Sequence, residues 1–521
     1  MAKLPDFRNE PLTNFSDPTH RAAFQQAIEY VRSQLGKHYP IRIGANDIQT
    51  GDSIQSLNPA RPAEIVGTVA AGRKEDAERA VEVAAEAFKK WQHVDLAERA
   101  RYLLRAAAEM RRRKHEFSAW MVFEIGKNWA EADADTAEAI DFLEYYARQA
   151  IRLKSASDQL YTLPGEQSEL QYIPLGVGAV IPPWNFPNAI MVGMTSAAIV
   201  AGNTVVLKPA SITPIIAYKF CEILWNLGLP SGVLNFLPGP GAAIGDTLVD
   251  HPKTRFIAFT GSKEVGMRIF ERAAKVQPGQ LWLKRTVLEM GGKDAVVVDE
   301  TADLEAAATG IVVSAFGFQG QKCSAGSRAI IVDAVYEQVA SRVVEKTRQL
   351  TQGAPDQAPE IDQGPVSDAK AMQKILEYIE IGTQEGKLLC GGKAKVTPDG
   401  GYFIEPTVFG DVAAHARIAQ EEIFGPVLAL IRAQDYDHAL QIANGTEFGL
   451  TGAVYSQSRE RLEQARREYH VGNLYFNRKC TGAMVGVHPF GGFNMSGTDS
   501  KAGGPDYLLL FTQAKAISEK L

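Results

Sequence analysis

The fold class of this 521-residue chain is decided by the stretch Val177-Gly178-Ala179-Val180-Ile181-Pro182-Pro183-Trp184-Asn185-Phe186-Pro187. It begins with small and apolar residues and ends in a proline-rich turn, which is typical of a buried strand that stops abruptly. The pattern then predicts a helix over 188–200 and a second strand over 204–207. Strand, helix and strand at this spacing indicate a βαβ unit with two parallel strands.

The same alternation continues along the chain on both sides of this unit. Further strands of the first series are predicted over 233–237 and 255–259, with helices over 213–227 and 241–250. A second series begins near Val287, with strands predicted over 295–298, 329–332, 427–431 and 452–455 and a helix over 304–316. Helical patterns at 22–36, at 75–91 and after Asp95 precede both series. The sequence therefore predicts two α/β domains with parallel sheets.

Composition and charge exclude several classes of protein. The chain has 55 Lys and Arg against 61 Asp and Glu, a net charge of −6. A nucleic-acid or anionic-membrane partner would require a concentrated basic surface, so we expect neither. The most apolar stretch, 176–207, is broken by prolines before it reaches the roughly 18 residues of a membrane span.

The cysteines and the first residues indicate where the protein works. Four cysteines are too few and too scattered for a disulfide framework or a zinc site, so we expect no metal and a reducing compartment. Residues 1–10 have no apolar core of a signal peptide and carry acids that transit peptides avoid. We therefore expect a soluble cytoplasmic protein.

Two loops that follow predicted strands are candidates for ligand binding. The first, 182–187, contains Asn185, whose amide could donate a hydrogen bond to a developing oxyanion. The second, 259–266, places Gly261, Ser262 and Gly266 where a strand turns into a helix, so that backbone N–H groups can face a phosphate. The first stretch could instead be a loop made rigid by its prolines, and the second a plain tight turn. The sequence leaves both alternatives open.

Two further stretches carry possible catalytic groups. Cys323 is flanked by small residues that leave room for a substrate, and Lys322 beside it would favour the thiolate. Glu289 precedes two glycines that leave room for water, as a general base requires. Most lone cysteines are small buried hydrophobes, and an acid beside glycines is often only a turn residue, so these alternatives also remain.

Taken in order, these motifs resemble those of the aldehyde dehydrogenase superfamily. The matching stretches are P-W-N-F-P at 183–187, K-P-A at 208–210, F-T-G-S-x-x-x-G at 259–266, E-M-G-G-K at 289–293, G-Q-x-C at 320–323, E-x-F-G-P at 422–426 and P-F-G-G at 489–492. The likeness runs from about residue 55 to the C-terminus. Within the superfamily the chain most resembles the enzymes that oxidise L-glutamate γ-semialdehyde, through its N-terminal arm, Lys322-Cys323-Ser324 and the stretch 477–483.

The resemblance implies an aldehyde dehydrogenase-like α/β fold. Its parts would be a Rossmann-type NAD-binding domain, an α/β catalytic domain and a small β flap that mediates oligomerisation. The expected boundaries are an N-terminal arm over 1–50, the NAD-binding domain over 51–152 and 174–286, the catalytic domain over 287–476, the flap over 153–173 and 498–521, and a substrate-anchoring loop over 477–497. A homo-oligomer built from dimers is expected.

The resemblance also implies a reaction, the NAD-dependent oxidation of L-glutamate γ-semialdehyde to L-glutamate in the second step of proline catabolism. Cys323 matches the nucleophile that forms a thiohemiacetal and then a thioester. Asn185 and the Cys323 N–H match the oxyanion hole, and Glu289 matches the base that activates water.

The remaining matched residues are expected to bind the cofactor and the substrate. The cofactor residues are Trp184, Lys208, Ser211, Gly261, Ser262, Gly266, Glu422 and Phe424. The substrate residues are Phe186, Ser324, Gly482, Ala483 and Phe490. Ser211 stands where many NAD-preferring relatives carry Glu, so we expect NAD to be preferred and NADP to be accepted.

Three alternatives share part of this evidence. Another semialdehyde dehydrogenase would use the same chemistry, but one for a distal carboxylate would usually present an Arg. A catalytically silent protein on this fold would normally have lost Cys323 or Glu289, and both are present. An acyl transferase of the thiolase or phosphorylating type would use the cysteine but lack the hydrolytic glutamate.

Overall fold

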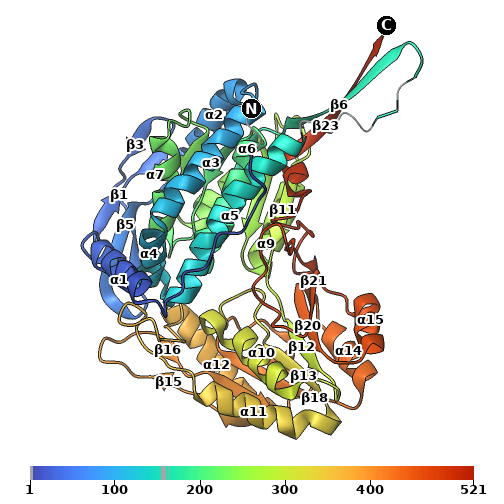
Figure 1. Ribbon diagram of the computed structural model, residues 1–521. Helices are drawn as coiled ribbons and strands as arrows, with labels where there is room; N and C mark the ends of the chain where they lie inside the picture. The colour runs from blue at the N-terminus through green and yellow to red at the C-terminus, as the bar shows by residue number, and fades with distance from the viewer. Residues whose placement is uncertain (1–3, 154–159, 162) are drawn as a thin grey trace.

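Two seven-stranded sheets organise the computed structural model, which describes residues 4–153, 160–161 and 163–521 (Figure 1). Across the first sheet the strands are β11 (Arg285–Glu289), β10 (Thr254–Thr260), β7 (Val177–Ile181), β8 (Thr204–Leu207), β9 (Leu234–Phe236), β2 (Ile41–Ile43) and β3 (Asn46–Ile48). Strands β7 to β11 are parallel, which confirms the predicted doubly wound arrangement. The chain leaves β7 toward β8 and β9 and returns to β10 and β11 on the other side. The strand order therefore reverses between β7 and β10, which is where ligands bind in such sheets.

The helices of the first domain enclose this sheet. They are α2 (Lys74–Trp91), α3 (Leu96–Arg112), α4 (Lys114–Ile125), α5 (Trp129–Leu153), α6 (Ala189–Val200) and α7 (Pro214–Asn226). All but one of the residues of α6 are buried, so this helix is apolar on every side and is part of the core. Helix α1 (Pro18–Arg32) begins four residues earlier than predicted, because Asp17 caps Thr19 N–H at 2.7 Å and Pro18 fits the first helical turn.

The predicted N-terminal arm contributes strands as well as a covering segment. Residues 41–48 form β2 and β3 at the edge of the first sheet, where alternate side chains Ile41 and Ile43 are fully buried. Strand β1 (Lys37–Tyr39) joins β5 (Arg61–Ala70) and β4 (Ser53–Asn58) in a three-stranded sheet. Ahead of α1 the chain lies along α5, to which Thr13 is bound through Asp133.

The second sheet is also mainly parallel, and it has a core on each face. Its order is β14 (Lys387–Cys390), β17 (Thr407–Gly410), β18 (Val427–Ala433), β13 (Arg328–Val332), β12 (Ala295–Val298), β20 (Thr451–Tyr455) and β21 (Asn473–Phe476), with only β14 antiparallel. Along β12, Ala295 and Val297 face one core while Val296 and Val298 face the other. The flanking helices are α10 (Leu304–Phe316), α11 (Tyr336–Arg348), α12 (Ala369–Glu385), α13 (Arg417–Gln420), α14 (Tyr436–Asn444) and α15 (Arg459–Glu468).

Short elements complete the described chain. They are the π-turn Gly241–Gly245, the 3₁₀ turns Gly317–Gly320, Asp333–Val335 and Tyr507–Phe511, and the short strands β15 (Ala394–Lys395), β16 (Phe403–Ile404), β19 (Phe448–Gly449) and β22 (Phe493–Asn494). Within the range 241–250, predicted as one helix, the π-turn is followed by α8 (Asp246–Asp250). No helix among the described residues is long and apolar enough to cross a membrane.

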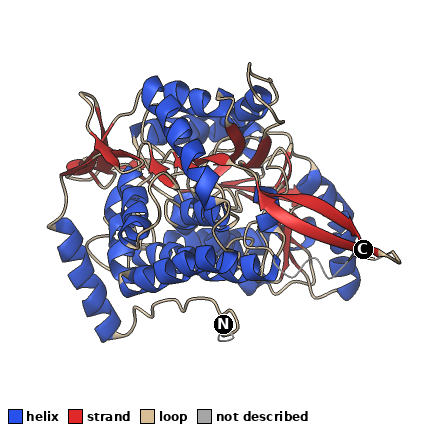
Figure 2. Ribbon diagram, turned by 90° about the horizontal axis from the view of Figure 1, so that it is seen from above, coloured by secondary structure: helices blue, strands red, loops and turns tan. Residues whose placement is uncertain are grey.

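A two-stranded ribbon projects from this body, as Figure 1 and Figure 2 show. It consists of β6 (Glu166–Pro174) and β23 (Thr512–Lys520), paired antiparallel from Thr512 opposite Pro174 to Lys520 opposite Glu166. Of the predicted flap, residues 154–159 and 162 lie outside the described residues. Residues 507–511 form the buried turn before β23 rather than part of the ribbon. The expected boundary at 286/287 also differs, because it falls inside β11, which belongs to the first sheet.

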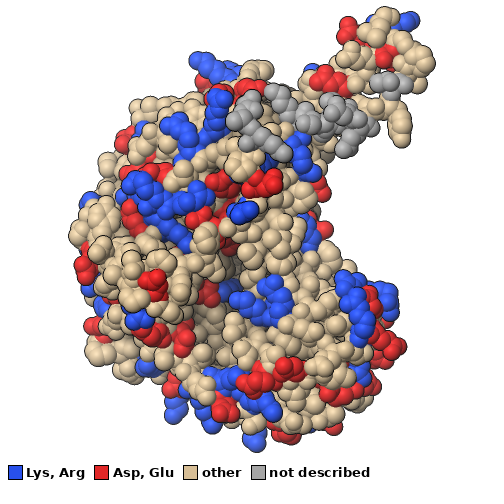
Figure 3. Space-filling view, viewed as in Figure 1, with Lys and Arg blue, Asp and Glu red and all other residues tan. Residues whose placement is uncertain are grey.

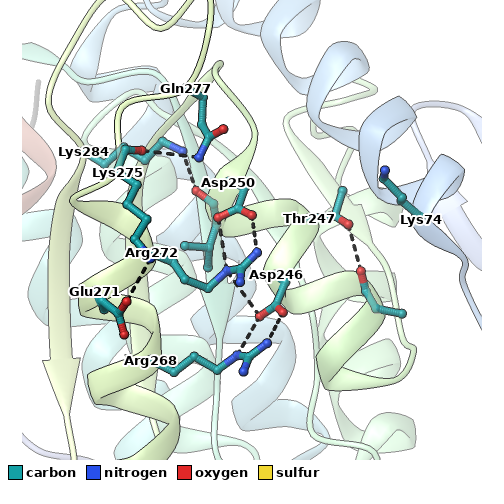
Figure 4. Close-up of polar contacts among 12 residues, drawn as sticks. Lys74, Asp246, Thr247, Asp250, Arg268, Glu271, Arg272, Lys275, Gln277 and Lys284 are labelled. Carbon is teal, nitrogen blue, oxygen red and sulfur yellow. Dashed lines mark hydrogen bonds and ion pairs between the residues drawn. The ribbon is translucent and has the colours of Figure 1, made fainter.

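Ion pairs fix the helix that follows β10. In α9 (Lys263–Ala273), Arg268 and Arg272 reach back to Asp246 and Asp250 of α8, with Nε–Oδ1 distances of 3.1 and 3.2 Å (Figure 4). Each guanidinium also uses a second nitrogen on the same carboxylate, a two-pronged geometry that restricts its orientation. These pairs hold the second half of α9 against α8. On the face in Figure 3, Lys and Arg are interspersed with Asp and Glu, so this face offers no continuous basic stripe.

We expect Gly178→Ala to destabilise the first domain. A Cβ at Gly178 would lie 2.0 Å from the Phe256 ring, which packs edge-on against Phe511 just before the ribbon. Forcing atoms into so tight a site typically costs about 1–3 kcal/mol. Urea unfolding should show this loss, whereas Gly51→Ala, with no atom within 4 Å of its Cβ, should change stability by less than about 0.5 kcal/mol. Equal stability of the two variants would contradict this packing.

Candidate active site

The candidate site lies where the carboxyl edge of the first sheet faces the amino edge of the second. Three contacts cross this junction. Asn185, after β7, donates from Nδ2 to the carbonyl of Gln321, before β13, at 3.0 Å. Trp184 meets Phe424, before β18, with ring centroids 5.4 Å apart in an edge-to-face arrangement. Gly292 N–H, between β11 and β12, donates to Glu422 Oε1 at 3.1 Å. The structure thus brings together motifs that are up to about 240 residues apart in sequence.

Cys323 is carried by a tightly constrained loop between α10 and β13. Phe318 and Gln319 adopt the left-handed region, with φ of 48° and 55°, which is uncommon for residues other than glycine. Gln321 is buried and accepts Ser367 N–H at 2.9 Å. Cys323 itself is half-buried, and its backbone N–H has no acceptor among the described residues. A thiol and a free N–H therefore lie next to each other on a fixed loop.

The resting charge state of Cys323 differs from the sequence expectation. Burial raises the pKa of its thiol, and the carboxylates of Asp294, Glu289 and Glu422 raise it further. The expected support from Lys322 is wrong, because its Nζ lies 2.7 Å from Glu131 Oε1, whose carboxylate offsets the positive charge. The isolated protein therefore holds Cys323 as a thiol, and its activation requires a base or a nearby positive charge.

Asn185 and Glu289 flank this thiol with complementary chemistry. The Asn185 amide uses one hydrogen on Gln321, which leaves its second hydrogen for a ligand. Glu289 ends β11, and its carboxylate accepts Ser500 Oγ–H at 2.5 Å and Gly492 N–H at 3.3 Å. Burial raises the pKa of Glu289 to about 7 in spite of these hydrogen bonds. The site thus contains a donor for an oxyanion and a base poised near neutral pH.

The residues expected to bind a dinucleotide line the carboxyl edge of the first sheet. Lys208 follows β8, is 6% exposed, and burial lowers its pKa to about 8. Its amine has a single weak partner among the described residues, the Pro209 carbonyl at 3.3 Å. Ser262 caps the N-terminus of α9, where free helical N–H groups favour a phosphate. A buried amine with spare donors and a helix N-terminus suit ribose hydroxyls and a pyrophosphate, so these residues fit a dinucleotide.

The other cofactor candidates surround the same edge. Gly261 and Gly266 lie under the helix start, and a Cβ at Gly266 would meet the Met290 sulfur at 2.4 Å. Burial raises the pKa of Glu422, which accepts Gly292 N–H beside the Cys323 loop. Ser211 lies exposed on the turn before α7, three residues after Lys208, and its side chain forms no hydrogen bond with the described residues.

The expected substrate residues lie on three loops, each of which is linked to a catalytic candidate. Phe186 lies beneath the Lys127 ammonium, which is 4.1 Å from the ring centroid and 2.6 Å from Asp135. The carbonyl of buried Ser324 is 3.5 Å from Cys480 Sγ, which connects the nucleophile loop to the loop 477–490. That loop presents Gly482 and Ala483 and ends in Phe490, whose backbone pairs with Ala502 beside the Glu289 partner Ser500.

Sequence reasoning missed several residues that build this site. Glu131 lies in α5 and Lys127 just before it, almost 200 residues ahead of the loop that they contact through Lys322 and Phe318, and no local motif marks them. Ser500 follows P-F-G-G closely, and only the fold shows that it reaches Glu289. Cys480 lacked suggestive neighbours in sequence yet packs behind Ser324. No cluster of three His, Cys, Asp or Glu suited to a metal ion occurs among the described residues.

Comparison with known proteins gives a consistent result over the whole chain. The model of the aldehyde dehydrogenase family matches residues 47–517. A 1-pyrroline-5-carboxylate dehydrogenase of Geobacillus kaustophilus is 62% identical over 98% of this chain and 99% of that protein. A crystal structure of 1-pyrroline-5-carboxylate dehydrogenase from Thermus with bound NAD is 53% identical, covers 100% of both chains and has a TM-score of 0.97.

A longer relative has the same fold over part of its length. The structure of proline utilization A from Bdellovibrio bacteriovorus is 45% identical, with a TM-score of 0.97, and the match covers 100% of this chain and 54% of that one. Since the family match spans most of the sequence and the relatives align from end to end, this chain belongs to the aldehyde dehydrogenase family.

Proposed function

We propose that the protein oxidises L-glutamate γ-semialdehyde, which is in equilibrium with 1-pyrroline-5-carboxylate, to L-glutamate with NAD as the oxidant. The observation that carries this proposal is the meeting of Cys323, Asn185 and Glu289 between the two sheet edges, beside a loop with two free backbone N–H groups. The relatives described above, named for this substrate, support the choice of aldehyde. This reaction is the second step of proline catabolism.

The chemistry would begin at Cys323. Its thiolate attacks the aldehyde carbon, a C–S bond forms, and the carbonyl oxygen becomes an oxyanion. The second Asn185 amide hydrogen and the Cys323 N–H are placed to hold that oxygen. Aimed donors of this kind typically contribute about 3 kcal/mol each to the transition state. Because the scheme requires a free thiol, we also infer that the protein works in a reducing compartment such as the cytoplasm.

NAD would supply the hydride acceptor that converts the thiohemiacetal carbon into a thioester. Lys208 and Ser262 would hold its adenosine ribose and pyrophosphate, and Glu422 its second ribose. Trp184 and Phe424 would form the wall that separates this half of the cleft from bulk water. Such a cofactor is expected at the carboxyl ends of β7 and β10, the neighbouring strands at which the strand order reverses.

Glu289 would complete the cycle by hydrolysis. Its carboxylate takes a proton from water, the hydroxyl adds to the thioester carbon, and the C–S bond breaks to release L-glutamate and the Cys323 thiol. The hydrogen bonds from Ser500 and Gly492 hold the carboxylate at the end of β11 while its buried position keeps the pKa near 7. This environment suits a base that must be partly protonated during the catalytic cycle.

We further infer that two copies of the chain associate through the ribbon and its surroundings. An isolated two-stranded ribbon is marginal in water, and β6–β23 projects with most side chains exposed. Beside its base, Arg285 binds the carbonyls of Leu509, Leu510 and Thr512.

Large apolar side chains lie exposed on α9 and on the segment leading to Arg285. They are Val265, Met267, Phe270, Val276, Leu281 and Leu283. Leu281 and Leu283 are 85% and 81% exposed, which a covering partner would explain. We expect light scattering to give at least twice the chain mass, and Leu281→Asp with Leu283→Asp to lower it. A monomeric mass for the wild type would contradict this inference.

The experiment that tests the function is a panel of aldehydes with NAD, followed through NADH absorbance. L-glutamate γ-semialdehyde should give the highest kcat/KM, above succinic semialdehyde and propanal. Cys323→Ala should remove activity on every aldehyde while NAD binding, measured by fluorescence quenching, stays close to the wild type. A preference for another aldehyde would refute the proposed substrate, and activity of Cys323→Ala within tenfold of wild type would refute the nucleophile.

Glu289 should control the second half of the reaction. Since its pKa is about 7, its carboxylate fraction rises as the pH rises through 7, and so should the steady-state rate. Glu289→Gln keeps the shape without the base, so a burst of NADH near one equivalent per site should precede a stalled turnover. Stopped-flow absorbance measures this burst, and exposed Glu271→Gln should behave as wild type. Normal NAD binding without a burst would place Glu289 in an earlier step.

The loop around Gly482 should recognise the carboxylate rather than the aldehyde. Gly482→Val adds bulk where the backbone has a φ of +78°, so KM for L-glutamate γ-semialdehyde should rise at least tenfold. Propanal has no carboxylate, and its kcat/KM should change by less than threefold. Gly400→Val is the control and should leave both aldehydes unaffected, because Gly400 also has a left-handed φ, of +69°, and no atom lies within 4 Å of its Cβ. Equal losses on both aldehydes would show that the loop supports the whole site.

Ser211 should determine how strongly NAD is preferred over NADP. A Glu at this position would repel a 2′-phosphate at about 4 Å by several kcal/mol at an intermediate dielectric, and Ser211 cannot. Wild type should therefore accept NADP at a measurable rate, and Ser211→Glu should raise the NAD-to-NADP ratio of kcat/KM at least tenfold. Ser211→Gln, which matches the size without the charge, should leave that ratio near wild type. An unchanged ratio in Ser211→Glu would mean that Ser211 does not face the ribose.

A further inference from the structure

The guanidinium of Arg478 is hydrogen-bonded to the loop that carries Gly482 and Ala483. Nη2 of Arg478 donates to the Thr481 carbonyl at 3.0 Å and to the Gly482 carbonyl at 3.1 Å. These two oxygens belong to successive peptide groups, so a single nitrogen fixes the orientation of both. Hydrogen bonds from a charged donor are stronger than neutral ones, which makes this a firm constraint on an otherwise exposed turn.

The guanidinium is itself held from two sides. Its carbon lies 4.6 Å from the centroid of the Tyr475 ring, on β21, and Tyr475 is 6% exposed. Its Nη1 lies 3.4 Å from His488 Nε2, an arrangement in which the tautomer of the imidazole decides whether a hydrogen bond forms. Arg478 therefore connects the edge strand of the second sheet to the turn at 481–482.

Because of peptide geometry, these hydrogen bonds determine which way the N–H groups of the turn point. In a trans peptide the C=O of one residue and the N–H of the next point in opposite directions. Since the carbonyls of Thr481 and Gly482 face Arg478, the N–H groups of Gly482 and Ala483 face away from it. Neither N–H has an acceptor among the described residues, whereas the following one, of Met484, donates to His488 Nδ1 at 3.2 Å. The left-handed φ of Gly482 lets both free N–H groups lie on the side of the turn away from Arg478.

The charge of Arg478 also reaches the far side of the turn. A carbonyl that accepts a hydrogen bond from a cation is polarised, and the N–H of the same peptide group becomes a stronger donor. Each free N–H therefore belongs to a peptide whose other end is bound to the guanidinium. Two polarised donors side by side match the two oxygens of a carboxylate, and the Lys479 ammonium lies close by, 3.5 Å from the position that a Cβ would take at Gly482.

We propose that Arg478 is the positioning residue that makes this turn selective for an aldehyde bearing an α-carboxylate. It would act through the peptide groups that it orients, without touching the substrate. The inference rests on the proposed function, since it assigns the group that tunes the carboxylate end of the same site. Arg478 should accordingly set KM for the carboxylate-bearing aldehyde and leave the steps at Cys323 unchanged.

The test compares Arg478→Met, Arg478→Lys and a matched control on two aldehydes. Arg466→Met is the control, because Arg466 also lies over an aromatic ring, Phe476 at 5.2 Å, but binds no carbonyl of the turn. Arg478→Met should raise KM for L-glutamate γ-semialdehyde at least tenfold with kcat within twofold, while kcat/KM for propanal stays within twofold. Arg478→Lys should recover only part of the affinity, since a compact ammonium does not reproduce the fork of a guanidinium. Arg466→Met should match wild type throughout.

Binding of L-glutamate, measured by calorimetry without turnover, separates this inference from the proposed function. Wild type that binds L-glutamate at least tenfold more tightly than Arg478→Met supports the inference, even if another aldehyde proves to be the better substrate. Three results would overturn it: unchanged KM and glutamate binding in Arg478→Met, equal losses on both aldehydes, or full recovery by Arg478→Lys. A wild type that neither binds L-glutamate nor prefers its semialdehyde would refute the function and the inference together.

Discussion

The catalytic arrangement depends on the hydrogen bond from Asn185 to the Gln321 carbonyl, because it joins the two sheets at the point where their chemistry meets. Asn185 lies in the loop that follows β7 of one sheet, and Gln321 lies in the loop that leads into β13 of the other. The first sheet carries the Asn185 amide and the second carries the Cys323 thiol and its N–H, so the two expected oxyanion donors meet only at this junction. The buried prolines around Asn185 and the left-handed backbone at Phe318 and Gln319 keep both partners in place, so the geometry is set before any ligand arrives.

Burial determines the charge states of the side chains that the proposed reaction would use. The same desolvation raises the pKa of Glu289 to about 7, raises that of the Cys323 thiol, and lowers that of Lys208 to about 8. Each group is thereby shifted toward its neutral form and is ready to change charge when a partner approaches. Lys322 differs from these groups, because it is paired with a carboxylate. The charge of Glu131 offsets that of Lys322 and removes its influence on the neighbouring thiol.

Sequence reasoning predicted local elements well and their partners less well. Strands β7 and β8 and helix α10 have the predicted bounds, because runs of Val and Ile and caps such as Asp303 act within a few residues. Strand β11 was predicted too, but its periodicity could not show that it pairs with β10 rather than starting the second sheet. The short strands within 41–48 lack any such run, and contacts like Lys322 with Glu131 depend on folding across 191 residues.

The difference between local patterns and long-range contacts also applies to substrate recognition, which the chain would carry out with side chains at one end and backbone groups at the other. The motifs carry the groups that would react, which the residue types reveal: a thiol, an amide and a carboxylate. The end of the cleft that would meet the substrate carboxylate consists of backbone N–H groups on a glycine turn, and their direction depends on carbonyls held by Arg478 from behind. A nearby cation such as the Lys479 ammonium would attract any anion, whereas two aimed N–H groups would favour a planar carboxylate. The stretch 477–483 marks this turn in the sequence, but only the folded structure shows that Arg478 holds its carbonyls.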